Sequence, residues 1–140
     1  MSANVLIVDD SETMRGMIKR TLAISGLDIG DVFEAANGIE ALARMAEHPI
    51  GVMLLDINMP LMNGIRLVER LQVDPRLRDV PIILASTEGS EARISALLAA
   101  GARGFIRKPF HPEQLRDVLM PIVGLRNAAA DKLCEPDISF

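Results

Sequence analysis

The sequence lacks the residue types on which several classes of protein depend. It has one cysteine, Cys134, no tryptophan or tyrosine, and only 3% aromatic residues in all. A single cysteine excludes an intrachain disulfide and a cysteine-rich zinc site. The core must therefore be aliphatic, and the cysteine usage fits a reducing cytoplasm.

Long apolar runs and an excess of positive charge are absent as well. No stretch approaches the roughly 20 apolar residues of a membrane-spanning helix, and the N-terminus lacks the pattern of a signal peptide. The formal net charge is −4 at pH 7, so no general basic field attracts nucleic acid. We therefore expect a cytoplasmic protein that binds neither a membrane nor DNA directly.

Two patterns alternate along the 140 residues, a length that suits one domain. Short apolar runs, typical of strands buried on both faces of a sheet, lie at 5–8, 32–35, 51–55, 82–85 and 104–107. Apolar residues at helical spacing lie at 14–22, 39–46, 64–71, 94–101 and 115–122. This order predicts a doubly wound α/β fold, an open five-stranded parallel sheet with helices on both faces.

Local signals place several helix ends. Gly26 follows the first predicted helix and is suited to cap it. Asn37 precedes the second, and Pro112 fits the first turn of the fifth. Pro121 has no N–H group and a ring that clashes inside a helix, so the fifth helix is predicted to kink or end near Met120.

Polar residues follow four of the predicted strands. Asp9 and Asp10 follow the first, Asp56 ends the third, Ser86 follows the fourth, and Lys108 follows the fifth. In an open parallel sheet, ligands bind beyond the carboxyl ends of the strands, where the strand order reverses. We therefore expect these residues to meet at one edge of the sheet.

Together these residues carry the parts of phosphoryl transfer. Crowded carboxylates repel one another, and a divalent cation with oxygen ligands, such as Mg²⁺, relieves the repulsion. An aspartate is a nucleophile that forms an aspartyl phosphate, and a lysine and a hydroxyl group bind phosphoryl oxygens. Each residue alone also has a structural explanation: Asp9 and Asp10 as a helix cap, Ser86 as a turn residue, Lys108 as a solvated lysine.

The chain resembles the receiver domains of response regulators, the CheY-like single-domain type in particular, from about residue 4 to residue 125. The motifs that carry this resemblance are Val8-Asp9-Asp10-Ser11, Leu54-Leu55-Asp56-Ile57-Asn58-Met59-Pro60, Asn63-Gly64, Ser86-Thr87-Glu88 and Lys108-Pro109-Phe110. The resemblance implies a flavodoxin-like sheet of strand order 2-1-3-4-5. It also implies a receiver domain over 1–125 and a C-terminal tail over 126–140 without a separate effector domain.

The same resemblance implies a phosphoacceptor and a metal site. Asp56 is expected to accept the phosphoryl group. Asp10, Asp56 and the backbone carbonyl of Asn58 are expected to bind Mg²⁺, and Asp9 to act through a bound water molecule.

Further residues are implied around the acceptor. Ser86 and Lys108 are expected to contact phosphoryl oxygens, and the bond from Lys108 to Pro109 is expected to be cis, which would orient the lysine. Asn58 and Glu88 are expected to tune how fast water removes the phosphoryl group.

The resemblance also implies a switch. Phosphorylation is expected to draw Ser86 inward, so that Phe105 turns into the space that it leaves. A downstream protein would then bind the face formed by the fourth helix, the fifth strand and the fifth helix, which includes Ile94, Phe105 and Arg107. Chemotaxis or motility signalling is the output considered. The expected phosphodonor is a histidine kinase or a histidine phosphotransfer protein. Chemotaxis regulators often carry tyrosine where this chain has Phe105.

Three other functions compete with this interpretation. An aspartyl-nucleophile phosphatase needs a second acid two residues after Asp56, where this chain has Asn58. A flavodoxin-like mononucleotide binder needs a Ser-, Thr- and Gly-rich loop where Asp9 and Asp10 stand. A non-phosphorylated receiver scaffold remains as the third. We expect a phosphoacceptor that assists only its own phosphorylation and dephosphorylation, rather than an enzyme.

Overall fold

Strands and helices alternate along the part of the chain that the computed structural model describes, residues 3–57, 64–86, 91–108 and 110–124. The elements are β1 (Ala3–Val8), α1 (Glu12–Ile24), β2 (Ile29–Ala35), α2 (Gly38–Glu47), β3 (Val52–Asp56), α3 (Gly64–Gln72), β4 (Ile82–Ser86), α4 (Glu91–Ala100), β5 (Gly104–Arg107) and α5 (Pro112–Val123). None of these described helices has the length and apolar character needed to cross a membrane.

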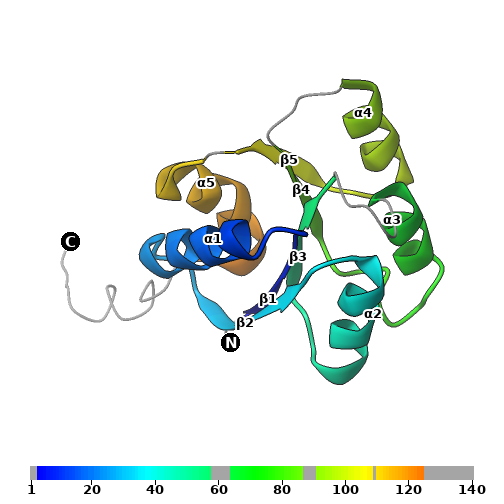
Figure 1. Ribbon diagram of the computed structural model, residues 1–140, viewed down its shortest axis with the longest axis horizontal. Helices are drawn as coiled ribbons and strands as arrows, with labels where there is room; N and C mark the ends of the chain where they lie inside the picture. Colours follow the sequence, from blue (N-terminus) through cyan, green and yellow to red (C-terminus); the bar gives the residue numbers. More distant parts are fainter. Residues whose placement is uncertain (1–2, 58–63, 87–90, 109, 125–140) are drawn as a thin grey trace.

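The strands form one parallel sheet of order β2-β1-β3-β4-β5. Parallel neighbours need a crossover connection, and here each crossover contains a helix. Helices α1 and α5 cover one face of the sheet, and α2, α3 and α4 cover the other (Figure 1). The predicted fold class and strand order are confirmed.

Alternation along each central strand divides the core into two layers. Leu6 and Val8 of β1 point into the layer beneath α2, α3 and α4, while Val5 and Ile7 point into the layer beneath α1 and α5. All four side chains have an exposed fraction of 0%. Burial on both faces explains why these strands read as continuous apolar runs in the sequence.

The predicted helix ends are largely confirmed. The Asn37 side chain accepts a hydrogen bond from the Glu40 backbone N–H at 2.9 Å and so caps α2. Gly26 directly follows the C-cap residue of α1 and adopts a φ of +82°, a conformation that glycine reaches without strain. Pro112 is the first residue of α5, where its missing N–H would have no helical partner.

The fifth helix was predicted to kink or end near Met120; it does not end there, because α5 continues through Pro121 to Val123, and the kink stays a prediction. A proline removes one helical hydrogen bond, here the bond to the carbonyl of Asp117. That loss falls in the last turn, which is closed by a 2.9 Å bond from the Gly124 N–H to the Met120 carbonyl. The helix therefore ends at Gly124 rather than at the proline.

Candidate functional site

The carboxyl ends of β1 and β3 bring three acidic residues together. Asp9 and Asp10 directly follow β1, and Asp56 is the last residue of β3. These strands are neighbours, with Val8 paired to Leu55. The chain leaves β1 toward β2 on one side, and β3 lies on the other, so the acids occupy the point where the strand order reverses.

The three carboxylates form a tight cluster. One oxygen from each of Asp9, Asp10 and Asp56 lies within 4.8 Å of the others. Asp9 and Asp56 are buried, with exposed fractions of 2% and 7%, whereas Asp10 is exposed. Carboxylates this close repel one another, and the two buried ones have also lost most of their water. The cluster therefore needs positive charge.

Lys108, which follows β5, supplies one positive charge inside the cluster. Its ammonium lies 2.5 Å from Oδ2 of Asp9 and 3.8 Å from Oδ1 of Asp56. The lysine is itself buried, with an exposed fraction of 6%. The sequence prediction that Lys108 meets the acids is thus confirmed, and the structure adds Asp9 as its direct partner.

Hydrogen bonds to the surrounding elements fix both the backbone and the side chain of Asp9. Its Oδ1 accepts a 2.9 Å bond from the Ser11 N–H, and its own N–H donates to the Ala35 carbonyl of β2 at 3.0 Å. Its backbone carbonyl accepts a 2.6 Å bond from Nη1 of Arg15 in α1. The turn that carries the first two acids is therefore fixed by α1, β2 and Lys108 together.

Arg15 and its partner Glu34 were not found by reasoning from the sequence. Nε of Arg15 donates to Oε1 of Glu34 at 2.9 Å, and Lys19 reaches the other Glu34 oxygen at 3.1 Å. Burial raises the pKa of the Glu34 carboxyl, but hydrogen bonds from Arg15 and Lys19 outweigh this and lower the pKa below its usual range. No spacing in the sequence signals this contact, because it depends on α1 packing beside β2.

The donor set of the cluster suits a hard cation. Three carboxylates offer oxygen ligands and no nitrogen or sulfur, and their oxygens lie close enough together to hold one metal ion. Oxygen-only sites favour Mg²⁺ or Ca²⁺ over zinc. The described residues therefore fit a divalent cation at the end of the sheet.

Comparison with known proteins identifies the family. The model of the response regulator receiver domain matches residues 5–120. The chain belongs to the response regulator receiver family. It is 42% identical over 121 residues to the chemotaxis protein CheY1 of Helicobacter pylori, an alignment that covers 86% of this chain and 96% of CheY1.

Two further relatives agree with this family. A CheY homologue of Campylobacter jejuni is 41% identical, with 86% of this chain and 92% of the homologue covered. The solved structure of the chemotaxis protein CheY4 of Vibrio cholerae is similar with a TM-score of 0.78 at 36% identity, covering 88% of this chain and all of CheY4. This receiver domain is thus closely related to chemotaxis response regulators over most of its length.

The remaining residues predicted for the site are described in part. The backbone of Ser86 ends β4 and is paired with Arg107 of β5, one position beyond the residue that faces Asp56. Asn58, Glu88 and Pro109 lie outside the described residues.

The residues predicted for an output face lie on the layer of α2, α3 and α4 or beside it. Ile94 of α4 and Phe105 of β5 are half-buried and pack against the same apolar cluster. Arg107 is exposed at the end of β5. The structure therefore places a half-buried aromatic side chain three residues before Lys108 in the receiver domain.

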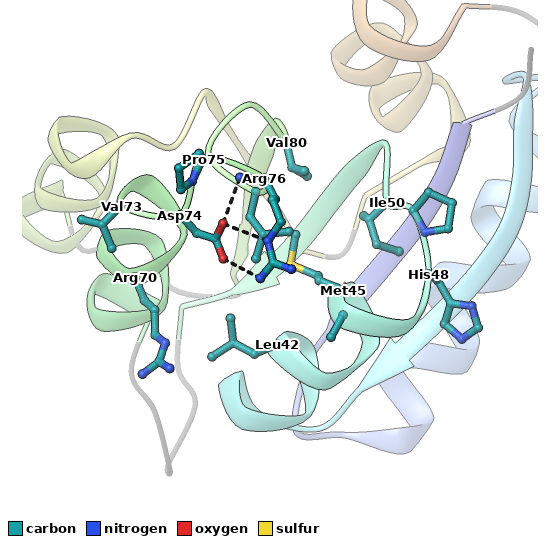
Figure 2. A pocket seen from close by; sticks show the side chains of 13 residues that line it. Leu42, Met45, His48, Ile50, Arg70, Val73, Asp74, Pro75, Arg76 and Val80 are labelled. Carbon is teal, nitrogen blue, oxygen red and sulfur yellow. Dashed lines mark hydrogen bonds and ion pairs between the residues drawn. The ribbon is translucent and has the colours of Figure 1, made fainter.

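A separate pocket lies at the opposite end of the sheet (Figure 2). Its volume is about 850 Å³, and it is lined by residues such as Ile50 and Val80, which stand just before β3 and β4. Its only acidic residue, Asp74, bonds to Arg76, and this hydrogen bond lowers the pKa of the Asp74 carboxyl. The pocket is therefore distinct from the acidic cluster at the carboxyl ends.

Proposed function

We propose that this receiver domain is a phosphorylation switch in which Asp56 accepts a phosphoryl group from a phosphohistidine. The observation that carries the proposal is the cluster at the end of β3. Asp56 is buried there beside two further acids, and the Lys108 ammonium lies 3.8 Å from its Oδ1. A buried, crowded carboxylate is costly to a fold, so its presence favours a chemical role.

The proposed transfer exchanges one bond to phosphorus for another. A carboxylate oxygen of Asp56 bonds to phosphorus as the bond from phosphorus to the donor imidazole nitrogen breaks. The nitrogen keeps the electron pair of the broken bond. The Lys108 ammonium faces the incoming phosphoryl oxygens and offsets their negative charge. Water later hydrolyses the acyl phosphate, so the domain turns over only its own modification.

We propose that the metal ion is Mg²⁺. Asp10, Asp56 and the backbone carbonyl of Asn58 would hold it, and Asp9 would act through a bound water molecule. The ion supplies positive charge against the carboxylates and the phosphoryl oxygens. The all-oxygen donor set of the described cluster supports this choice.

The proposed output follows the response-regulator pattern. Ser86 moves toward the phosphoryl group and Phe105 turns inward, which alters the face of α4, β5 and α5 around Ile94 and Arg107. Asn58 and Glu88 set the lifetime of the phosphoryl group. The half-buried state of Phe105 supports this role, because the ring packs against the core without being fully enclosed by it.

We propose a place for the domain in a two-component pathway. The donor is a histidine kinase or a histidine phosphotransfer protein, and the output is a protein that binds the switched face. The relatives named as chemotaxis proteins align with this chain over 92–96% of their own length, and this similarity favours chemotaxis or motility signalling. In this proposal residues 1–125 form the receiver domain and residues 126–140 a C-terminal tail.

Intact-mass analysis after incubation with acetyl phosphate tests the acceptor. The wild type should gain one phosphoryl group in the presence of Mg²⁺ and none in EDTA. Asp56→Asn should gain none in either. Asp31→Asn is the matched control, since Asp31 is an exposed aspartate of β2 away from the cluster, and it should behave as the wild type. Phosphorylation of Asp56→Asn to the wild-type level would refute the assignment.

A further inference from the structure

We infer that Arg15 is a positioning residue for the cation site: its guanidinium holds the peptide between Asp9 and Asp10, and Glu34 anchors the guanidinium. The inference deepens the proposed function and rests on it for the identity of the cation. It concerns two residues that the sequence did not single out and that lie outside the acidic cluster.

The geometry of Arg15 is that of a clamp. Nη1 donates to the backbone carbonyl oxygen of Asp9 at 2.6 Å, and Nε donates to Oε1 of Glu34 at 2.9 Å. The side chain is largely buried, with 14% of its surface exposed. The rigid fork of a guanidinium can serve two such acceptors at once, whereas the single ammonium of a lysine cannot reproduce that geometry.

The bond to Asp9 acts on Asp10 through the peptide plane. The carbonyl of Asp9 and the nitrogen of Asp10 belong to one planar group, so fixing the oxygen fixes the direction in which the chain enters Asp10. Asp9 is already held through its N–H and both carboxylate oxygens. Within the described residues the carboxylate of Asp10 has no hydrogen bond or ion pair, so its place in the cluster depends on its backbone.

Glu34 makes a cation in this position compatible with metal binding. A bare guanidinium near the acids would repel a divalent ion. Glu34 of β2 offsets part of that charge, and its second oxygen accepts a hydrogen bond from Lys19 at 3.1 Å. The backbone carbonyl of Glu34 accepts a further bond from Nε of Arg44 in α2 at 3.1 Å. These hydrogen bonds therefore connect Arg15 of α1 to β2 and, through Glu34, to α2.

An ordinary ion pair between a helix and a strand would make a different prediction. Such a pair contributes to stability alone, and its loss would leave the affinity for Mg²⁺ unchanged. A positioning residue of a metal site instead changes affinity, because partners outside the direct ligands orient the ligands. The two explanations differ in one measurable quantity, the dissociation constant of the ion.

The test is a titration of Mg²⁺ into the full chain, followed by the NMR shifts of backbone amides. Arg15→Lys keeps the charge and loses the fork, and we expect its dissociation constant to rise about 10-fold. Lys19→Met is the matched control: it removes the other cation on Glu34, which has no contact with Asp9, and should keep the wild-type constant. Glu34→Gln should weaken binding as well, because the guanidinium loses its anchor and its counter-charge.

Phosphorylation by acetyl phosphate provides a second readout. For Arg15→Lys the half-saturating Mg²⁺ concentration should rise in parallel, while the extent of phosphorylation at saturating Mg²⁺ stays at the wild-type level. A variant that merely folds poorly would instead lose extent at every Mg²⁺ concentration. Thermal unfolding in EDTA confirms that each variant is folded under the conditions of the titration.

The inference is overturned if Arg15→Lys binds Mg²⁺ as tightly as the wild type, or if Lys19→Met weakens binding equally. It also falls if the wild type binds no Mg²⁺. The proposed function fails separately, when wild-type protein that binds Mg²⁺ gains no phosphoryl group on Asp56. In that case the dissociation constants still decide whether Arg15 positions the cation site.

Discussion

Replacing Asp10 by asparagine should stabilise the metal-free protein and remove most of its stabilisation by Mg²⁺. Asp10 is the exposed member of the acidic cluster. Asparagine has nearly the same shape, so the change removes a charge and leaves no cavity. The substitution thus separates the electrostatic cost of the cluster from its packing.

The size of the effect follows from the spacing of the charges. Two unit charges 4.8 Å apart, the outer limit of the cluster, repel by about 3.5 kcal/mol at an effective dielectric constant of 20 and by about 0.9 kcal/mol in water. Exposure of Asp10 puts the value near the lower limit, and the Lys108 ammonium offsets part of the same field. We therefore expect Asp10→Asn to raise the free energy of unfolding by about 1 kcal/mol in EDTA.

Binding of the cation should reverse this order. An ion that binds only the folded state at ten times its dissociation constant adds about 1.4 kcal/mol to the wild type, and about 2.7 kcal/mol at one hundred times. Asp10→Asn has lost a ligand and should gain much less. The variant should therefore be the more stable protein in EDTA and the less stable one in saturating Mg²⁺.

Urea unfolding followed by far-UV circular dichroism measures both free energies, which suits a chain without tryptophan. Asp31→Asn is again the control, because it removes one exposed negative charge from β2 and leaves the cluster intact. Its stability should change by less than about 0.5 kcal/mol, and its gain from Mg²⁺ should match the wild type. A destabilised Asp10→Asn in EDTA, or an undiminished gain from Mg²⁺, would refute the electrostatic reasoning.

Two further predictions concern the stability of the fold. The lowered pKa of Glu34, for which hydrogen bonds from Arg15 and Lys19 outweigh burial, adds stability that is complete above its ordinary value of 4.5 and is lost as pH falls through the folded value. Glu34→Gln should therefore cost about 0.5–1 kcal/mol at pH 7 and almost nothing in strong acid, as measured by urea unfolding across pH. Asn37→Ala removes the cap of α2 and should cost about 1 kcal/mol, or about 3 °C in thermal unfolding, whereas Asn37→Asp should keep the cap.

The elements of the fold could be predicted wherever the sequence pattern reflects burial. The bounds of β5 agree with the predicted 104–107, because both ends of this short strand are marked by a change of pattern. Strand β2 was predicted from residue 32 but begins at Ile29. It lies at the edge of the sheet, and Gly30 and Asp31 are exposed there. These two exposed residues interrupt the apolar pattern, so the start of the strand has no signal in the sequence.

The membership of the acidic cluster could be predicted, whereas its internal contacts could not. Asp9, Asp10, Asp56 and Lys108 stand at strand ends, and parallel strands place their carboxyl ends at one edge whatever their order. Which carboxylate the lysine bonds is a matter of ångströms and depends on side-chain packing. From the sequence we predicted that Lys108 contacts a phosphoryl group. In the structure its ammonium lies 2.5 Å from Oδ2 of Asp9.

The charge of the cluster accounts for both its lysine and its need for a cation. Asp9, Asp10 and Asp56 carry three negative charges and Lys108 one positive charge, which leaves −3 + 1 = −2. The buried ammonium thus offsets part of the negative charge of the two buried acids, and breaking a buried ion pair by removing one partner is strongly destabilising. The ammonium does not complete the neutralisation, and the remaining charge equals that of one divalent cation with the sign reversed. A second lysine in place of the cation would leave −2 + 1 = −1, so the site would attract a divalent ion less strongly. The partial compensation seen here therefore lowers the electrostatic cost of the cluster and still leaves negative charge that attracts a divalent cation.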